Sequence, residues 1–143
     1  MEWKHDDGGR LAAGFKGQTG DCAARAVAIA TGMPYREAYD LCNRYAAEER
    51  PSKRRRGHSN ARTGMHSATM RKLLADLGWR WVPTMGIGTG ATVHLDAEEL
   101  PAGRLIVRVS RHFAAVIDGV LHDIHDCSRE TTRCVYGYWV KSE

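Results

Sequence analysis

Residues 21–32 read Asp-Cys-Ala-Ala-Arg-Ala-Val-Ala-Ile-Ala-Thr-Gly, and this stretch decides the fold that we expect. It is apolar on nearly every side except at Arg25. A helix that is apolar all round lies in the middle of a core. Because Asp21 is a good N-cap and Gly32 a good C-terminal stop, the sequence predicts a central buried helix over residues 22–31. Arg25 would then need an internal partner.

Two more helices are expected in the first half of the chain. One begins near Pro34, whose fixed φ suits a first helical turn, and runs to about Glu49 with Cys42 on its buried face. The other covers about residues 65–77, where apolar side chains recur at helical spacing. Residues 1–17 are polar and glycine-rich, and we expect them to be flexible.

The second half of the chain has the pattern of strands. A glycine-rich turn at residues 85–90 follows the first of them. The expected strands cover residues 79–84, 104–109, 113–117, 120–124 and 134–140. Helices followed by antiparallel strands predict an α+β domain, and 143 residues suit a single domain over the whole chain.

The bulk composition is that of an ordinary globular protein, with 43% hydrophobic and 27% charged residues. No apolar run approaches the roughly 20 residues that span a bilayer, so we expect no membrane contact. The first residues lack the pattern of a secretory signal, which predicts a cytoplasmic protein. In that reducing compartment the four cysteines are expected to be free thiols. The sequence has no CxxC pair, so a zinc knuckle is not expected.

The net charge of +4 comes from one segment, the basic loop of residues 50–64, and the rest of the chain is mildly acidic. This loop contains Arg50, Lys53, Arg54, Arg55, Arg56 and Arg62. Such a run is usually a solvated surface, but it can also contact phosphate. Lys53, Arg54, Arg55 and Arg56 are therefore candidate contacts to a nucleic acid or a host protein.

Cys22 has the position of an activated thiol. A helix N-terminus favours the thiolate, because its partial positive charge and unpaired N–H groups lower a cysteine pKa. Cys22 directly follows the predicted N-cap and would occupy the first helical turn. A nucleophile also needs a base, which is itself held by a third group.

Residues 111–123 supply both groups. Asp118-Gly119 between two apolar runs is a strong hairpin signal, and a two-residue turn makes Ile117 face Val120. His112 then lies opposite residue 125, with Asp123 as a same-face diagonal neighbour within reach. His122 points to the other face, and a slip of one residue would reverse this assignment.

Gly-Asp-Cys opening an apolar helix, then a strand beginning His-Phe-Ala-Ala-Val, then Asp-Gly and a strand bearing Asp, resembles the small papain-like cysteine peptidases. The resemblance covers residues 18–140, and residues 83–139 also resemble small proteins encoded by tailed phages. It implies a papain-like fold, with the catalytic cysteine on a central buried helix packed on a C-terminal antiparallel sheet. It also implies Cys22 as nucleophile, His112 as base and acid, and Asp123 as the orienting group, with no cofactor.

The resemblance has one departure, in the oxyanion hole. Papain-like enzymes usually carry a glutamine about six residues before the cysteine, and that position is Lys16 here. Gln18 could serve if the intervening turn is tighter, beside the backbone N–H of Cys22.

A metal site is the competing interpretation of one cluster. It consists of His122, Asp123, His125, Asp126, Cys127 and Cys134. Zinc needs several ligands converging on one point, and His122 and His125 would point to opposite faces of a strand. We therefore expect no metal. The glycine-rich turn lacks the lysine and the following helix of a phosphate-binding loop.

The sequence thus predicts a cysteine hydrolase that cleaves a peptide, isopeptide or other amide or acyl bond through a thioester. A transamidase would use the same chemistry with an amine as acceptor. The alternative is an inactive papain-like binding module that contacts a nucleic acid or a host protein through its basic loop.

Overall fold

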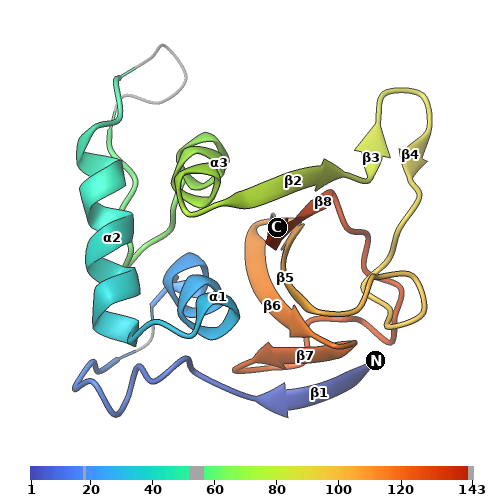
Figure 1. Cartoon of the computed structure of the whole chain (residues 1–143), viewed down its shortest axis with the longest axis horizontal. Coiled ribbons are helices and arrows are strands. Elements are labelled where there is room, and N and C mark those ends of the chain that lie inside the picture. Colours follow the sequence, from blue (N-terminus) through green and yellow to red (C-terminus); the bar gives the residue numbers. More distant parts are fainter. Residues whose placement is uncertain (18, 52–56, 142–143) are drawn as a thin grey trace.

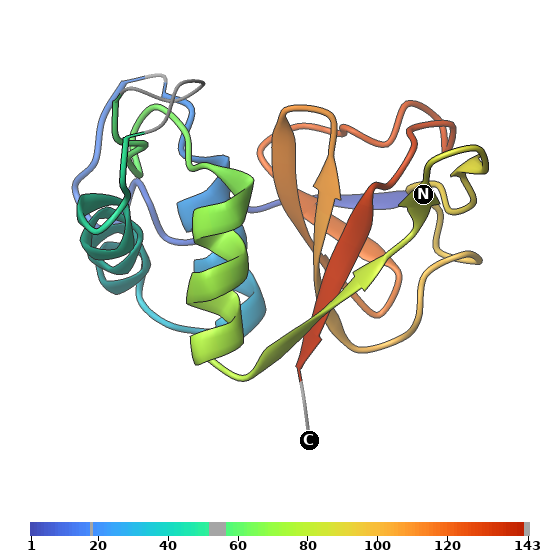
Figure 2. The same cartoon turned by 90° about the horizontal axis from the view of Figure 1, so that it is seen from above.

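The computed structural model describes residues 1–17, 19–51 and 57–141. Three helices pack on one side of a twisted sheet (Figures 1 and 2). The helices are α1 (Cys22–Thr31), α2 (Tyr35–Ala47) and α3 (Ser67–Asp76). The strands are β1 (Glu2–His5), β2 (Trp79–Pro83), β3 (Met85–Gly86), β4 (Gly90–Ala91), β5 (Arg104–Val109), β6 (His112–Ile117), β7 (Val120–Asp123) and β8 (Gly137–Lys141). The predicted α+β class is confirmed.

Helix α1 is the buried centre that its composition predicts. All eight residues from Ala23 to Ala30 are buried, and Gly32 ends the helix in the left-handed region, with its N–H bonded to Ala28 O at 2.9 Å. The predicted capping role of Asp21 is wrong in one respect. Its side chain makes no capping hydrogen bond, because its carboxylate turns inward to Arg25 and to the Tyr35 hydroxyl.

The main sheet has six strands in the order β1-β7-β6-β5-β8-β2. All neighbours are antiparallel except β1, which pairs in parallel with β7. The structure therefore differs from the expectation of a flexible N-terminus, since residues 2–5 form an edge strand. Its register places Glu2 beside Val120 and His5 beside Asp123. This strand was not predicted because it is held by backbone hydrogen bonds to β7, which the polar side chains of the N-terminal sequence do not reveal.

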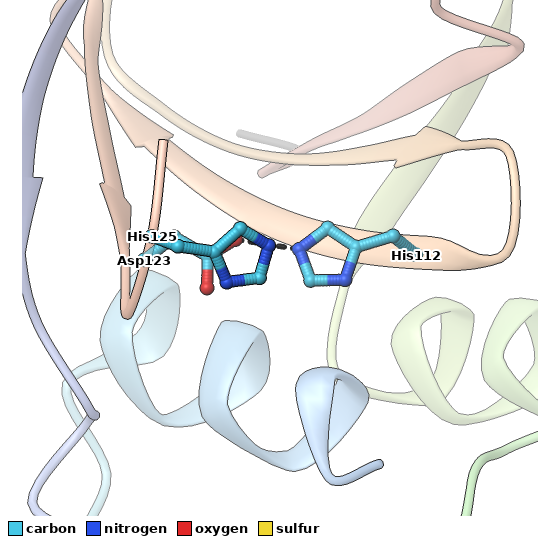
Figure 3. Close-up of side chains that lie close together, drawn as sticks. All are labelled: His112, Asp123 and His125. Atoms are coloured by element: carbon cyan, nitrogen blue, oxygen red, sulfur yellow. Dashed lines mark hydrogen bonds and ion pairs between the residues drawn. The ribbon is translucent and has the colours of Figure 1, made fainter. Parts of the chain in front are cut away.

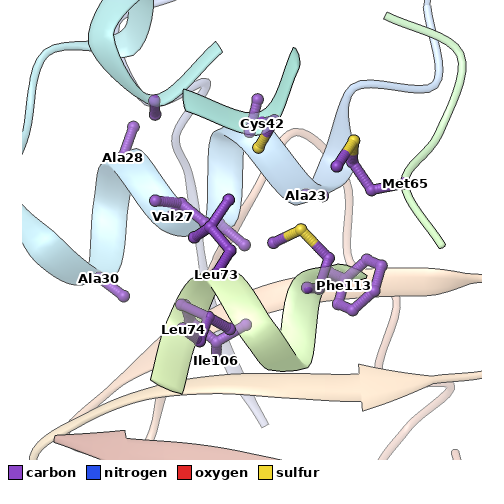
Figure 4. Packing of buried hydrophobic residues seen from close by; sticks show 14 of the residues in the cluster. Ala23, Val27, Ala28, Ala30, Cys42, Met65, Leu73, Leu74, Ile106 and Phe113 are labelled. Atoms are coloured by element: carbon purple, nitrogen blue, oxygen red, sulfur yellow. The ribbon is translucent and has the colours of Figure 1, made fainter. Parts of the chain in front are cut away.

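Each face of the sheet covers a separate apolar cluster. On the helical face, Ile106 of β5 and Phe113 of β6 pack against α1 and α3, as Figure 4 shows. Cys42 of α2 is fully buried in this cluster, which confirms its predicted packing role. On the other face, alternate strand residues such as Val107 and Val116 pack beneath the segments around Leu95 and Cys127.

The element bounds differ little from those predicted, except near the glycine-rich turn. Residues 85–86 and 90–91 pair as a small separate hairpin. The last strand begins at Gly137 rather than at residue 134, since Cys134 instead forms an isolated bridge with His94. Among the described residues, no helix is both long and apolar enough to cross a bilayer.

Candidate active site

A cleft of about 330 Å³ opens at the N-terminal end of α1. Cys22 lies in its wall with His112 and Phe113 at the start of β6, and residues 63–65 also line it. A second hollow, of about 560 Å³, adjoins this cleft and shares Thr19, Arg25 and Ile124 with it. The thiol thus lies where an extended ligand could reach it from two sides.

His112 and Asp123 meet as the hairpin register predicts. Strands β6 and β7 pair Ile117 with Val120 and Ala115 with His122, so residues 112 and 123 both fall on the face opposite to His122. His112 Nε2 lies 2.5 Å from Asp123 Oδ2, and Figure 3 shows the two side chains pointing toward each other. His122 instead bonds Asp6, at 3.1 Å between Nδ1 and Oδ2.

Cys22 is the first residue of α1 and is partly buried. Burial by itself raises the pKa of the thiol. This is outweighed by a hydrogen bond to His112, by the charge of that imidazole, by the Phe113 backbone N–H and by Arg25, so the Cys22 pKa is lowered. The surroundings of Cys22 favour the thiolate, the form that acts as a nucleophile.

The imidazole of His112 is correspondingly held in its charged form. Burial lowers its pKa, but hydrogen bonds to Asp123, Cys127 and Cys22 dominate and raise the His112 pKa to about 11. Burial raises the pKa of the Asp123 carboxyl, yet its contact with His112 lowers it overall. The two shifts agree, since both describe an ion pair between an imidazolium and a carboxylate.

Arg25 has internal partners that sequence reasoning left unassigned. Its guanidinium bonds the buried Asp21 carboxylate one turn earlier, and its Nη2 lies 3.5 Å from Asp123 Oδ1. Arg10 contacts the same Asp21, at 3.2 Å between Nε and Oδ2. A lone arginine on an apolar helix was the available signal, but the identity of its partners depends on how the strands pack over α1.

The N-terminal strand holds Asp123 from behind, a role that the sequence did not suggest. Trp3 Nε1 and the Asp6 backbone N–H each donate to Asp123 O at 3.0 Å. The Cys127 thiol lies 3.6 Å from Asp123 Oδ2. Asp123 is therefore fixed at both its carbonyl and its carboxylate, and it is only 3% exposed.

Gly20 sets the width of the cleft. A Cβ at this position would lie 2.9 Å from the Thr63 carbonyl oxygen, closer than real Cβ contacts allow. Thr63 is held in turn by the Asn60–Gly64 bridge and by a hydrogen bond from its N–H to Asn60 Oδ1. The absence of a side chain at Gly20 lets the residue 60–64 loop approach the nucleophile.

Several predicted residues lie outside the described part of the chain. These are the oxyanion candidate Gln18 and the candidate contacts Lys53, Arg54, Arg55 and Arg56.

All four cysteines are free thiols. Cys42, fully buried near Cys22, has its pKa raised to about 12, first by burial and then by the charge of Cys22. Cys134 is exposed. The thiols thus differ sharply in their surroundings: Cys22 lies beside His112 in the open cleft, whereas Cys127, which also interacts with His112, is buried.

Three ligand-bearing side chains converge at the rim of the site. One ligand atom from each of His112, Asp123 and His125 lies within 4.8 Å of the others. Sequence reasoning considered His122 with His125 instead and missed His112 as the second imidazole. The set suits a borderline metal such as zinc, but Asp123 is already bonded by His112 and lies next to the Arg25 cation. A metal ion would have to displace the bond between His112 and Asp123, and it would lie close to the positive charge of Arg25.

Comparison with protein-family models, with curated proteins and with solved structures finds no match to this chain.

Proposed function

We propose that the protein is a papain-like cysteine hydrolase that cleaves an amide or related acyl bond through a thioester. The observation that carries the proposal is the His112–Asp123 pair in the same cleft as the Cys22 thiol, which lies at a helix N-terminus with a lowered pKa. A papain-like relationship is supported by the chain order of these three residues, with the cysteine on the central helix and the other two on antiparallel strands.

The proposed reaction uses the two nitrogens of His112 for different tasks. Nε2 is held by Asp123, which leaves Nδ1 to exchange a proton with Cys22. The thiolate attacks the carbonyl carbon, and a C–S bond forms. When the tetrahedral intermediate collapses, the C–N bond breaks and the imidazolium proton passes to the leaving amine. Neutral His112 then takes a proton from water, whose hydroxide displaces the thiolate and releases the acid.

The intermediate oxyanion needs donors near the carbonyl. The Cys22 backbone N–H at the start of α1 is one such donor, and Gln18 stays a proposed second donor. An amine that enters the cleft in place of water would give transamidation, which follows from the same residues.

Thiol labelling tests the proposal without knowledge of the substrate. Iodoacetamide at neutral pH, with sites read by mass spectrometry, should label Cys22 faster than Cys134, although Cys134 is more exposed. His112→Ala should remove this advantage, while Cys134→Ser should leave the Cys22 rate unchanged. Labelling of Cys22 at or below the rate of Cys134 would exclude an activated nucleophile.

A further inference from the structure

The cleft around Cys22 carries positive charge that the proposed reaction does not use. Arg25, Arg108 and Arg111 all line it, together with His112 and His125, and no aspartate or glutamate of the described residues contributes to its lining. The charge of Arg25 is balanced by Asp21 and Asp123. The charges of Arg108 and Arg111 are not balanced by any ion pair among the described residues.

Arg108 is held in place without being neutralised. It lies on β5 directly opposite Phe113 of β6, and its guanidinium carbon is 4.4 Å from the centre of the Phe113 ring. It is half-buried, and burial lowers its pKa while the charge of the Cys22 thiolate raises it. Among the described residues, no carboxylate lies within ion-pairing distance of Arg108.

A partly buried cation that is paired with no carboxylate is unfavourable unless a ligand supplies the missing counter-ion. The flat guanidinium stacked on an aromatic ring keeps its N–H groups free at the edge, where they can bind a carboxylate in a bidentate way. Arg108 therefore has the position and chemistry of a ligand-binding group, next to the nucleophile.

Arg111 adds a second unpaired charge at the mouth of the cleft. It ends the two-residue connection between β5 and β6 and has a φ of 57°. This left-handed conformation is unfavourable for a residue with a Cβ and would suit glycine. Among residues 1–17, 19–51 and 57–141, no acidic side chain pairs with it. Arginine at a position better suited to glycine is consistent with a use for its charge.

We propose that Arg108 and Arg111 form an anion subsite that binds a carboxylate of the substrate close to the scissile carbonyl. The inference rests on the proposed hydrolase function, and it narrows the substrate class to acidic peptides or amides. Arg108 makes the main contact from within the cleft, and Arg111 adds a weaker, solvent-exposed attraction.

A matched pair of reagents tests the subsite. Iodoacetate and iodoacetamide deliver nearly the same alkyl group, but only iodoacetate carries a carboxylate. The ratio of their rates at Cys22 should exceed the ratio at Cys134 in the same molecule. Arg108→Gln should lower the Cys22 ratio roughly tenfold, as expected for one lost hydrogen bond to a charged group. Arg111→Gly, which also relieves the backbone, should lower it roughly twofold, and Arg108→Lys should restore part of the loss.

Protection experiments identify the anion. N-acetylglutamate should slow the labelling of Cys22 by iodoacetamide, whereas N-acetylglutamine should not. Protection by inorganic phosphate alone, or a reagent ratio unchanged in Arg108→Gln, would overturn the carboxylate subsite. Slow labelling of Cys22 by iodoacetamide itself would instead reject the hydrolase proposal, so the two failures are distinguishable.

Discussion

The Arg25 guanidinium and the Asp123 carboxylate lie 3.5 Å apart, between Nη2 and Oδ1, and both side chains are almost completely buried. The other carboxylate oxygen, Oδ2, binds His112. Asp123 thus links a structural cation of the central helix to the imidazole beside Cys22. The position of Asp123 therefore depends on the packing of α1 in the core as well as on the β6–β7 hairpin.

Replacing the Asp123 carboxylate by an amide tests its electrostatic role. In Asp123→Asn the His112 pKa should fall, because its strongest favourable contact is lost, and the Cys22 thiolate should lose its charged partner. We expect the pH midpoint of Cys22 labelling by iodoacetamide to rise by about one unit, which corresponds to roughly a tenfold slower rate at neutral pH. The pH–rate profile of labelling measures this shift.

Asp118→Asn is the matched control on the same hairpin. Asparagine tolerates the φ of 48° at this turn position, and its side-chain oxygen can keep the 2.7 Å hydrogen bond from the Gly103 N–H. Its labelling profile should equal that of the wild type. Equal shifts in the two variants would mean that any change in the hairpin perturbs Cys22.

Removing the Arg25 charge should destabilise the fold. Arg25→Met leaves the buried carboxylates of Asp21 and Asp123 without their shared cation, and breaking such a pair typically costs about 3–5 kcal/mol. Lys72→Met is the control, because Lys72 pairs with Glu48 at 3.6 Å on an exposed helical surface. It should change the free energy of unfolding by less than about 0.5 kcal/mol. Urea unfolding that gives equal losses for both variants would contradict the burial argument.

Local patterns in the sequence were sufficient to predict much of this arrangement. The helix of residues 22–31 follows from its uniform apolarity, since only a buried site accommodates such a segment. The meeting of His112 with Asp123 follows from Asp118-Gly119, because a two-residue turn fixes the pairing of every later residue in the hairpin. Both inferences use contacts between residues that are near in sequence.

Contacts over long sequence separations were not predictable in this way. The second partner of Arg25, Asp123, lies on a strand 98 residues later, and a different packing of the sheet on α1 would have replaced it. The pairing of Glu2–His5 with β7 is a backbone contact that leaves no pattern in four exposed side chains, of which only Trp3 is a large hydrophobic. Arg108 lines the same cleft as Cys22 only because β5 lies beside β6, and a strand arginine by itself indicates nothing of that kind.

The stability of the fold should depend on Asp123 in acid. Its folded pKa lies below the ordinary value of 3.8, despite the opposing effect of burial, because of His112, the Ile124 N–H and Arg25. By linkage, its contribution is fully present above pH 3.8 and is lost as the pH falls through the lower folded value. The difference in unfolding free energy between the wild type and Asp123→Asn should therefore be constant between about pH 4 and pH 6 and shrink below about pH 4. It should also shrink as the pH rises toward 11, because the raised pKa of His112 depends on Asp123. A difference that grows in acid would reverse the assigned sign.

A single methyl group at Gly20 should displace the residue 60–64 loop or the start of α1, which carries Cys22. In Gly20→Ala the new Cβ collides with the Thr63 carbonyl oxygen, and relieving the overlap must move the residue 60–64 loop or the start of α1. We expect a loss of about 1–3 kcal/mol in stability and slower labelling of Cys22. Gly57→Ala is the control, since a Cβ there meets nothing within 4 Å. Unchanged labelling in Gly20→Ala would show that the loop does not shape the site.

Zinc should act on this site as an inhibitor and not as a cofactor. Binding to His112, Asp123 and His125 would take the base away from Cys22, so added zinc should slow iodoacetamide labelling and EDTA should restore it. Inhibition should deepen as the pH rises, because zinc needs a neutral imidazole and must displace the proton between His112 and Asp123.

His125→Ala should weaken zinc inhibition by roughly tenfold. His94→Ala, which alters another exposed histidine paired with an acid at 3.2 Å, should not change it. If EDTA alone lowered the reactivity of Cys22, the three residues would be holding a functional metal, and the proposed imidazole–carboxylate pair would be the wrong description of the site.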